Sequence, residues 1–174
     1  REGLAYGRTR ADIRVVLVIV GLIGSFTMNA PVTTGLMARE VFDQGSGGFG
    51  MLTSIAAVGS LMGALVGARV ERPRLRYLVG SATAVGVTSV ASALMPTYEL
   101  FAVSLIPVGI SMLMLMTSAN STVQLAAAPQ MRGRVMALYM AVFMGGTAIG
   151  GPVVGWIGEA AGARAAILVG GIMA

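Results

Sequence analysis

Side chains able to do catalytic chemistry are scarce in this chain, and the missing types exclude several functions. The 174 residues include no Cys and no His, and only seven Asp and Glu. Disulfides, thiolate nucleophiles and cysteine-based zinc sites are therefore excluded, and a proton pathway would lack histidine, the commonest shuttle near neutral pH. An enzyme would depend on carboxylates, Tyr, Ser or Arg, so we expect no enzyme, no cofactor and no metal.

Two stripes of small polar residues have a spacing that suits a binding site. The first, at intervals of four, consists of Ser25, Asn29 and Thr33, and the second of Thr117, Asn120, Ser121 and Gln124. Each set shares one face if its segment is helical. Lining a wet cavity and bonding a neighbouring helix explain the stripes about equally well. Asn29 and Asn120 are the best candidates for contact with a bound molecule.

The basic residues decide between nucleic acid and membrane as partners. All twelve are Arg, and the net charge is +5. They occur in short clusters between apolar runs, and no basic helix interleaved with aromatic residues is present, so we expect no nucleic-acid partner. Retention of Arg in the loops of a membrane protein explains the net positive charge better than nucleic-acid binding does.

Long apolar runs dominate the rest of the chain, which is 56% hydrophobic and 11% charged. The runs cover residues 13–38, 49–68, 77–95, 100–127, 135–157 and 165–174, after a polar lead-in over 1–12 that we expect at the membrane surface. Soluble proteins do not sustain successive apolar runs of about 20 residues. We therefore predict an all-α membrane protein, a six-helix transmembrane bundle. Because the last run is short and the chain starts at Arg1, we expect a fragment with a truncated last helix.

The distribution of Arg among the loops predicts the orientation. With the N-terminus inside, ten Arg lie in inner segments, and only Arg39 and Arg164 lie in outer ones. Cytoplasmic loops retain basic residues, so we expect a cytoplasmic N-terminus. Aromatic residues near the ends of the runs suit an interfacial belt, namely Tyr77, Tyr98, Phe101 and Trp156.

Glycines recur at helical spacing in the second and fifth runs. The repeats are Gly59, Gly63 and Gly67, then Gly146 with Gly150, and Gly151 with Gly155. Small residues at intervals of four let a neighbouring backbone approach closely. We expect both helices to be packed inside the bundle.

Prolines and methionines add further candidates. Pro31 and Pro107 are expected to bend the first and fourth helices near the outer side, as part of a gate. Met136, Met140 and Met144 form a stripe that suits a promiscuous apolar cavity, although ordinary packing explains such a stripe more often. No Asp, Glu, Arg or Lys lies in the interior of any run.

The loop after the second run carries a family resemblance. The segment 67–76 reads GARVERPRLR, which resembles the G-x-x-x-D-R-x-G-R-R loop signature of the major facilitator superfamily. Gly67, Arg72 and Arg76 match, Glu71 replaces the acid, and Arg74 and Leu75 depart from the pattern. Two further stretches, EGLAYGRTRADIR and APQMRGRVMALY with Arg132 and Arg134, resemble the branch of enterobactin exporters and secretion-type efflux proteins.

The resemblance implies the C-terminal half, helices seven to twelve, of a twelve-helix efflux transporter of a bacterial inner membrane. It implies secondary active export, as an antiporter, of drugs or siderophore-like metabolites by alternating access. Expected partners are lipids, the small-molecule substrate and the N-terminal half, which would supply any ion-coupling carboxylate. Glu71, Arg72 and Arg134 would latch one conformation through charged pairs, or merely enforce topology. The alternative is a small structural membrane protein that oligomerises through its glycine faces.

Overall fold

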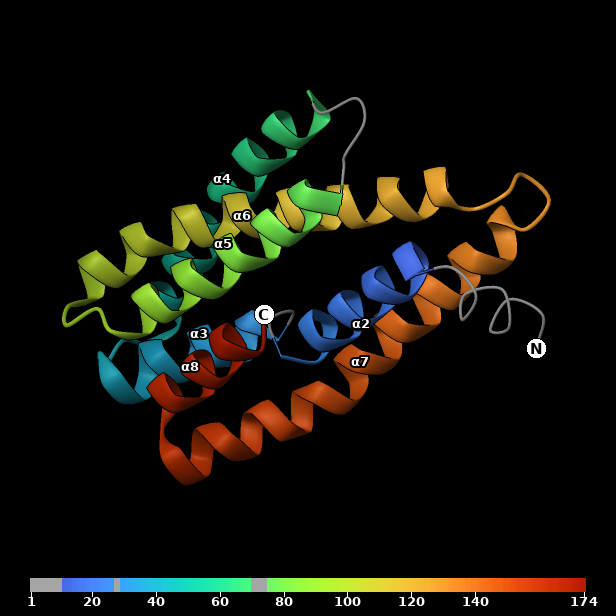
Figure 1. Cartoon of the computed structure of the whole chain (residues 1–174). Coiled ribbons are helices and arrows are strands. Elements are labelled where there is room, and N and C mark those ends of the chain that lie inside the picture. Colours follow the sequence, from blue (N-terminus) through green and yellow to red (C-terminus); the bar gives the residue numbers. More distant parts are fainter. Residues whose placement is uncertain (1–10, 27–28, 70–74) are drawn as a thin grey trace.

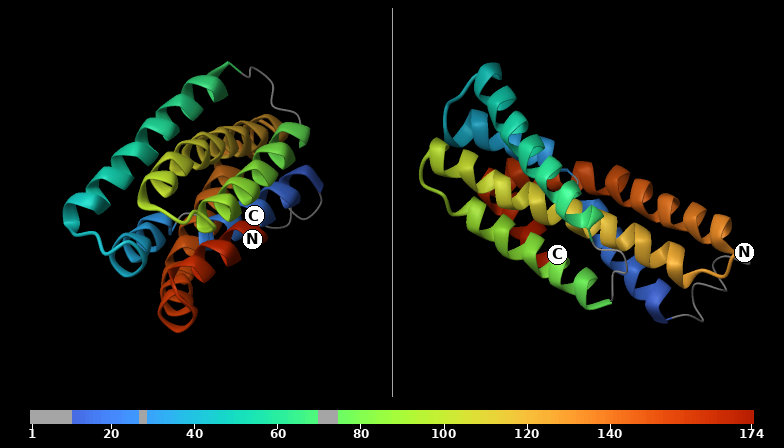
Figure 2. Two further views of the ribbon diagram at one scale, coloured as in Figure 1. Left: turned by 90° about the vertical axis from the view of Figure 1, so that its left-hand side faces the viewer. Right: turned by 90° about the horizontal axis from the view of Figure 1, so that it is seen from above.

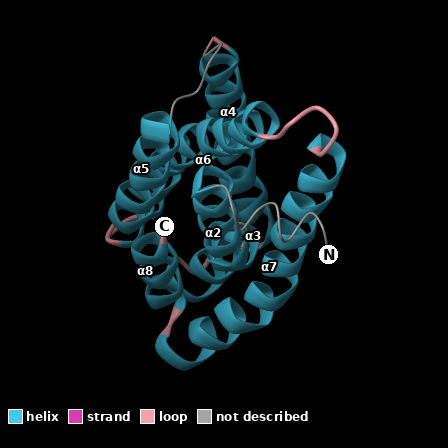
Figure 3. Cartoon of the chain, turned by 45° about the vertical axis from the view of Figure 1, so that its right-hand side comes forward, coloured by secondary structure: helices cyan, strands magenta, loops and turns pink. Residues whose placement is uncertain are grey.

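Helices are the only regular secondary structure in the residues that the structure describes. The computed structural model describes residues 11–26, 29–69 and 75–174 (Figure 1). The elements are α2 (Ala11–Phe26), α3 (Ala30–Leu36), the π-helix η1 (Met37–Val41), α4 (Ser46–Ala68), α5 (Leu75–Ala93), α6 (Tyr98–Ala126), α7 (Arg132–Ala161) and α8 (Ala163–Met173). Figure 3 shows only helices and loops in these ranges. The predicted all-α class is confirmed, and α2, α3 and η1 together replace the first predicted helix.

Four stretches of the described chain are long and apolar enough to cross a membrane. They are Arg14–Val41, Ser46–Ala68, Tyr98–Ala126 and Arg132–Ala161. The apolar helix α8 is shorter. Helix α5 is less apolar than the four spans, because it contains five Ser and Thr residues from Ser81 to Ser92. The charged residues of these four stretches lie in their terminal turns and are exposed, namely Arg14, Arg39, Glu40, Glu99, Arg132, Arg134 and Glu159.

The first membrane segment is interrupted near its middle. Asn29 precedes α3, and Pro31 occupies its first turn, where a missing backbone N–H costs least. The Asn29 side chain donates from Nδ2 to the Ser25 carbonyl, 2.9 Å away, and so joins the end of α2 to the start of α3. The segment continues as the wider η1 and ends at Val41, and Asp43 in the loop that follows has a φ of 51°. A short polar side chain tolerates this left-handed conformation.

Glycine allows the close approach of α4 to α6. A Cβ added at Gly63 would lie 2.8 Å from the Ile110 Cα, and one at Gly59 would lie 2.9 Å from the Ile106 Cα. On α6, a Cβ added at Gly109 would lie 2.6 Å from the Ala56 carbonyl oxygen. Backbone therefore lies directly against backbone, in the manner of small-residue membrane interfaces.

Glycine also lies at the contact of two further helix pairs, α2–α7 and α5–α8. Gly146 of α7 faces the Gly21 carbonyl of α2, 2.9 Å from an added Cβ, and Gly150 faces the Ser25 backbone. In the α5–α8 pair, a Cβ added at Gly86 would lie 2.7 Å from the Gly171 carbonyl oxygen. Figure 1 shows α2 and α3 between the group of α4, α5 and α6 and the long helix α7.

The expectation that the second and fifth helices lie inside the bundle is wrong for the helices as a whole. Gly59, Gly63 and Gly67 are buried, but the opposite face of α4 exposes Leu61 and Leu65. Figure 2 shows α4 on the outside of α6. The helix α7 likewise exposes large apolar side chains, namely Met144, Ile149 and Trp156. Glycine spacing identified a contact face and carried no information about the rest of the helix surface.

Two apolar clusters hold the bundle together. One joins α2, α5, α6 and the start of α7 around Val20, Val85 and Leu115. The other joins η1, α4 and α6 around Met37 and Phe101. Phe101 is 0% exposed, so its predicted place in an interfacial aromatic belt is wrong.

Candidate functional site

The first polar stripe is divided between a helix contact and a cavity. Ser25 donates to the Gly21 carbonyl at 2.8 Å and packs against Gly146 of α7. The Asn29 side chain lies against Gly151, and its amide bonds within its own segment. Thr33, which donates to the Ala30 carbonyl at 3.1 Å, is the member of this stripe that lines an internal cavity.

The second polar stripe lies on the last turns of α6. Thr117 donates to the Leu113 carbonyl at 2.8 Å and faces Gly67 of α4. The Gln124 amide donates to the Asn120 side-chain oxygen, and Gln124 is exposed. No hydrogen bond in the described ranges joins this stripe to the first one.

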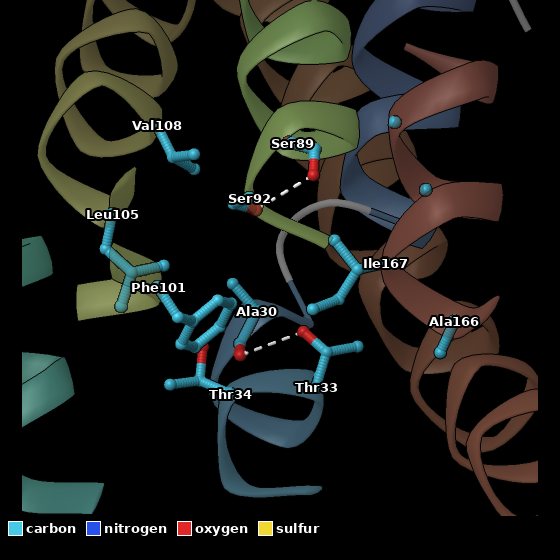
Figure 4. Close-up of a pocket in the computed structure, with 12 residues that line it drawn as sticks. Ala30, Thr33, Thr34, Ser89, Ser92, Phe101, Leu105, Val108, Ala166 and Ile167 are labelled. Atoms are coloured by element: carbon cyan, nitrogen blue, oxygen red, sulfur yellow. Dashed lines mark hydrogen bonds between the residues drawn. The ribbon is translucent and has the colours of Figure 1, made fainter. Parts of the chain in front are cut away.

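An internal cavity of about 40 Å³ lies among α3, α5, α6 and α8 (Figure 4). Phe101, Leu105 and Val108 form its wall on α6, and Ala166 and Ile167 form the opposite wall on α8. The polar lining comes from two neighbouring threonines of α3 and two serines of α5, namely Thr33, Thr34, Ser89 and Ser92.

The hydroxyl groups of this cavity are only partly paired. Ser92 donates to the Ser89 carbonyl at 2.8 Å, and Thr33 is bonded as described above. Thr34 and Ser89 are 7% and 6% exposed, and their hydroxyls have no partner among the described residues. Buried hydroxyls seek partners, and the cavity has room for about two or three water molecules. We therefore expect water molecules in this cavity, bonded to the Thr34 and Ser89 hydroxyls.

Thr34, Ser89 and Ser92 were missed by the sequence reasoning. A signal existed, because Ser81, Ser89 and Ser92 fall on one face of α5 at intervals of eight and three. The three serines are buried, as this shared face would predict.

The residues of the loop motif are only partly described. Glu71 and Arg72 lie outside the described residues. Gly67 is buried against α6, whereas Arg76 in the first turn of α5 and Arg132 at the start of α7 are exposed. Arg134 is also exposed, and its guanidinium approaches the Met131 sulfur at 3.9 Å.

The proline and methionine candidates occupy different environments. Pro31 stands at the start of α3, whereas Pro107 lies within the continuous helix α6. A second internal proline, Pro152 in α7, was not singled out from the sequence. Met140 and Met144 are exposed on α7, and Met136 packs against the first apolar cluster.

The buried polar side chains of the described ranges carry no charge. They comprise Asn29 and eight hydroxyl residues: Thr33, Thr34, Ser81, Ser89, Ser92, Ser111, Ser118 and Thr122. No group of three or more His, Cys, Asp or Glu that could hold a metal occurs within the residues described. The interior offers hydrogen bonds and apolar surface.

Long apolar helices with an uncharged interior define a multi-pass membrane protein. The family model of transmembrane secretion effectors matches residues 1–174. The chain therefore belongs to the transmembrane secretion effector family of the major facilitator superfamily. It is a secondary transporter and not an enzyme. A comparison with curated proteins gives no match.

Proposed function

We propose that this chain exports small apolar or amphipathic molecules, such as drugs or siderophore-like metabolites, by alternating access. The observation that supports this substrate class is that the described residues place no charge in the buried interior, which provides one amide and eight hydroxyls, and that the exposed candidates Gln124 and Met140 are uncharged too. A strongly charged substrate would have no counter-charge there, and burying an unpaired charge is costly.

We also propose that the six helices form the C-terminal half of a twelve-helix transporter. The degenerate loop motif after α4 supports this position, and so do the exposed apolar faces of α4 and α7, which suit lipid or a second bundle. The ten-to-two distribution of Arg supports a cytoplasmic N-terminus in a bacterial inner membrane.

Six residues of the two polar stripes, together with Met140, are candidates for substrate contact, and they differ in what their side chains touch. Gln124 and Met140 are exposed and Asn120 is half-buried, so a bound molecule could reach them. Ser25, Asn29 and Thr117 lie in helix contacts, and Thr33 lines the internal cavity. We therefore propose Asn120, Gln124 and Met140 for direct contact.

The rival function, a structural protein that oligomerises through glycine faces, receives less support. The three glycines of α4 that would form such a face are already buried. Gly59 and Gly63 pack against the α6 backbone, and Gly67 packs against Thr117.

The test is an efflux assay with the full-length protein in a bacterial host that lacks its own drug exporters. Cells are loaded with a neutral amphipathic dye or with a polyanionic dye of similar size. We expect export of the amphipathic dye, weakened by Asn120→Ala. The matched control Ser54→Ala should retain export, because the exposed Ser54 hydroxyl bonds only within α4. Export of the polyanionic dye alone, or net uptake, would refute the proposal.

A further inference from the structure

A second concavity, a groove of about 380 Å³, runs between α5 and α6. We call it the α5–α6 groove; its lining is Arg76, Tyr77, Gly80, Ser81, Ala84, Thr88, Pro107, Ile110, Ser111 and Met114. Neighbouring positions of the same helices, Leu78, Val85 and Leu115, belong to the apolar core. The groove is separate from the hydroxyl-lined cavity, with which it shares no residue.

The Ser and Thr hydroxyl groups of the groove are all engaged by protein atoms. Ser81 donates to the Leu78 carbonyl at 3.0 Å, Thr88 to the Ala84 carbonyl at 2.7 Å, and Ser111 to the Pro107 carbonyl at 2.8 Å. The Thr88 and Ser111 hydroxyls also lie 3.2 Å apart. These hydroxyls therefore do not require hydrogen bonds from water, and most of the remaining lining is hydrocarbon. The groove suits an apolar chain.

Two polar side chains with no partner among the described residues line one end of the groove. Arg76 and Tyr77, in the first turn of α5, are exposed, and neither forms a hydrogen bond or ion pair with a described residue. A guanidinium binds phosphate oxygens in a bidentate manner, and a phenol can donate a further bond. The ligand should thus carry an anion at one end and hydrocarbon at the other.

The length of the groove matches one leaflet of a bilayer. Eleven residues separate Tyr77 from Thr88, which corresponds to about 16 Å along a helix. The hydrocarbon core of a membrane is about 30 Å thick, so each leaflet contributes roughly half of that. A lipid with its phosphate beside Arg76 would place its acyl chain along the groove as far as the bilayer centre.

We propose that the α5–α6 groove is a binding site for one anionic phospholipid. The Arg76 guanidinium and the Tyr77 hydroxyl hold the phosphate, and one acyl chain lies over Gly80, Ala84 and Met114. Basic pockets between membrane helices bind anionic head groups in this way. The groove shares no residue with the candidate substrate contacts.

The test measures lipid retention by native mass spectrometry of the purified full-length protein. Phosphatidylglycerol and phosphatidylcholine with identical acyl chains are titrated separately. We expect one tight phosphatidylglycerol site, with a preference of about fivefold, the effect of one basic residue near an anionic surface. Arg76→Gln should abolish the preference, and Gly80→Leu should remove the tight site for both lipids.

Two matched variants control for loss of charge and for added bulk. Arg14→Gln removes another exposed Arg outside the groove, and Gly145→Leu adds the same side chain on α7. A Cβ at Gly80 or at Gly145 meets no atom within 4 Å, so neither change should disturb the fold. Both controls should keep the tight site. Equal affinity for the two lipids, or a preference that survives Arg76→Gln, would overturn the proposal.

Discussion

Replacing Gly63 with alanine tests how tightly α4 is held against α6. The added methyl carbon would lie 2.8 Å from the Ile110 Cα, whereas ordinary contact begins at 3.4 Å. The helices must therefore separate by at least about 0.6 Å, and a gap of 0.5–1 Å removes roughly a quarter to a half of each dispersion contact. Overpacking of this kind costs about 1–3 kcal/mol of unfolding free energy.

The same geometry predicts how two such changes combine. Gly59 faces Ile106 one turn away, where an added methyl carbon would lie 2.9 Å from the Cα. A single displacement of α4 relieves both clashes, so Gly59→Ala with Gly63→Ala should cost less than the sum of the single changes.

The measurement is the free energy of unfolding of the full-length protein in detergent micelles, by steric trapping. Gly50→Ala is the control within the same helix, because a Cβ at Gly50 meets no atom within 4 Å. That change should be neutral or stabilising, by up to about 1 kcal/mol from helix propensity. Equal stability of the Gly63→Ala and Gly50→Ala proteins would show that glycine does not set the spacing of α4 and α6.

Three further predictions concern other parts of the bundle. Pro31→Ala together with Pro107→Ala should change the accessibility of engineered cysteines and slow transport, and unchanged rates would remove these prolines from the gate. Thr34→Val should lower the unfolding free energy by about 1 kcal/mol, since bonds from its buried hydroxyl to water are lost; a gain in stability would indicate a dry cavity. Arg164→Gln should destabilise the start of α8 by about 1–2 kcal/mol, because the guanidinium donates to the Met95 carbonyl at 3.1 Å, whereas unaltered hydrogen exchange there would contradict this role.

The helical segments and their order were predictable because long apolar runs have few alternatives in a bilayer, although only four described stretches are long and apolar enough to cross it. The interruption at Asn29 was not placed from the sequence, although Pro31 lay within the predicted bend. A proline in a helical pattern permits either a kink or a new start. The structure has a new start at Pro31 and a continuous helix at Pro107. That difference depends on tertiary contacts, which a local pattern does not contain.

The polar candidates were harder to rank from spacing alone. Ser25 and Asn29 face the glycines of α7, a partner more than 100 positions later in the sequence. Thr34 and Ser89 become neighbours only when α3 and α5 pack around one cavity. Helical periodicity identifies a shared face, but it does not identify the element opposite.

The order of the glycine-mediated pairs bears on how the chain is inserted during translation. The pairs α4–α6, α5–α8 and α2–α7 each join helices that are separated by at least one other helix in the sequence. Helix α2 is synthesised before α7, so the face that later packs against α7 has no partner until α7 emerges from the ribosome. The same holds for α5 and α8. In a chain whose synthesis stops after α6, the α4–α6 pair can form, but the glycine faces of α2 and α5 lack their partners.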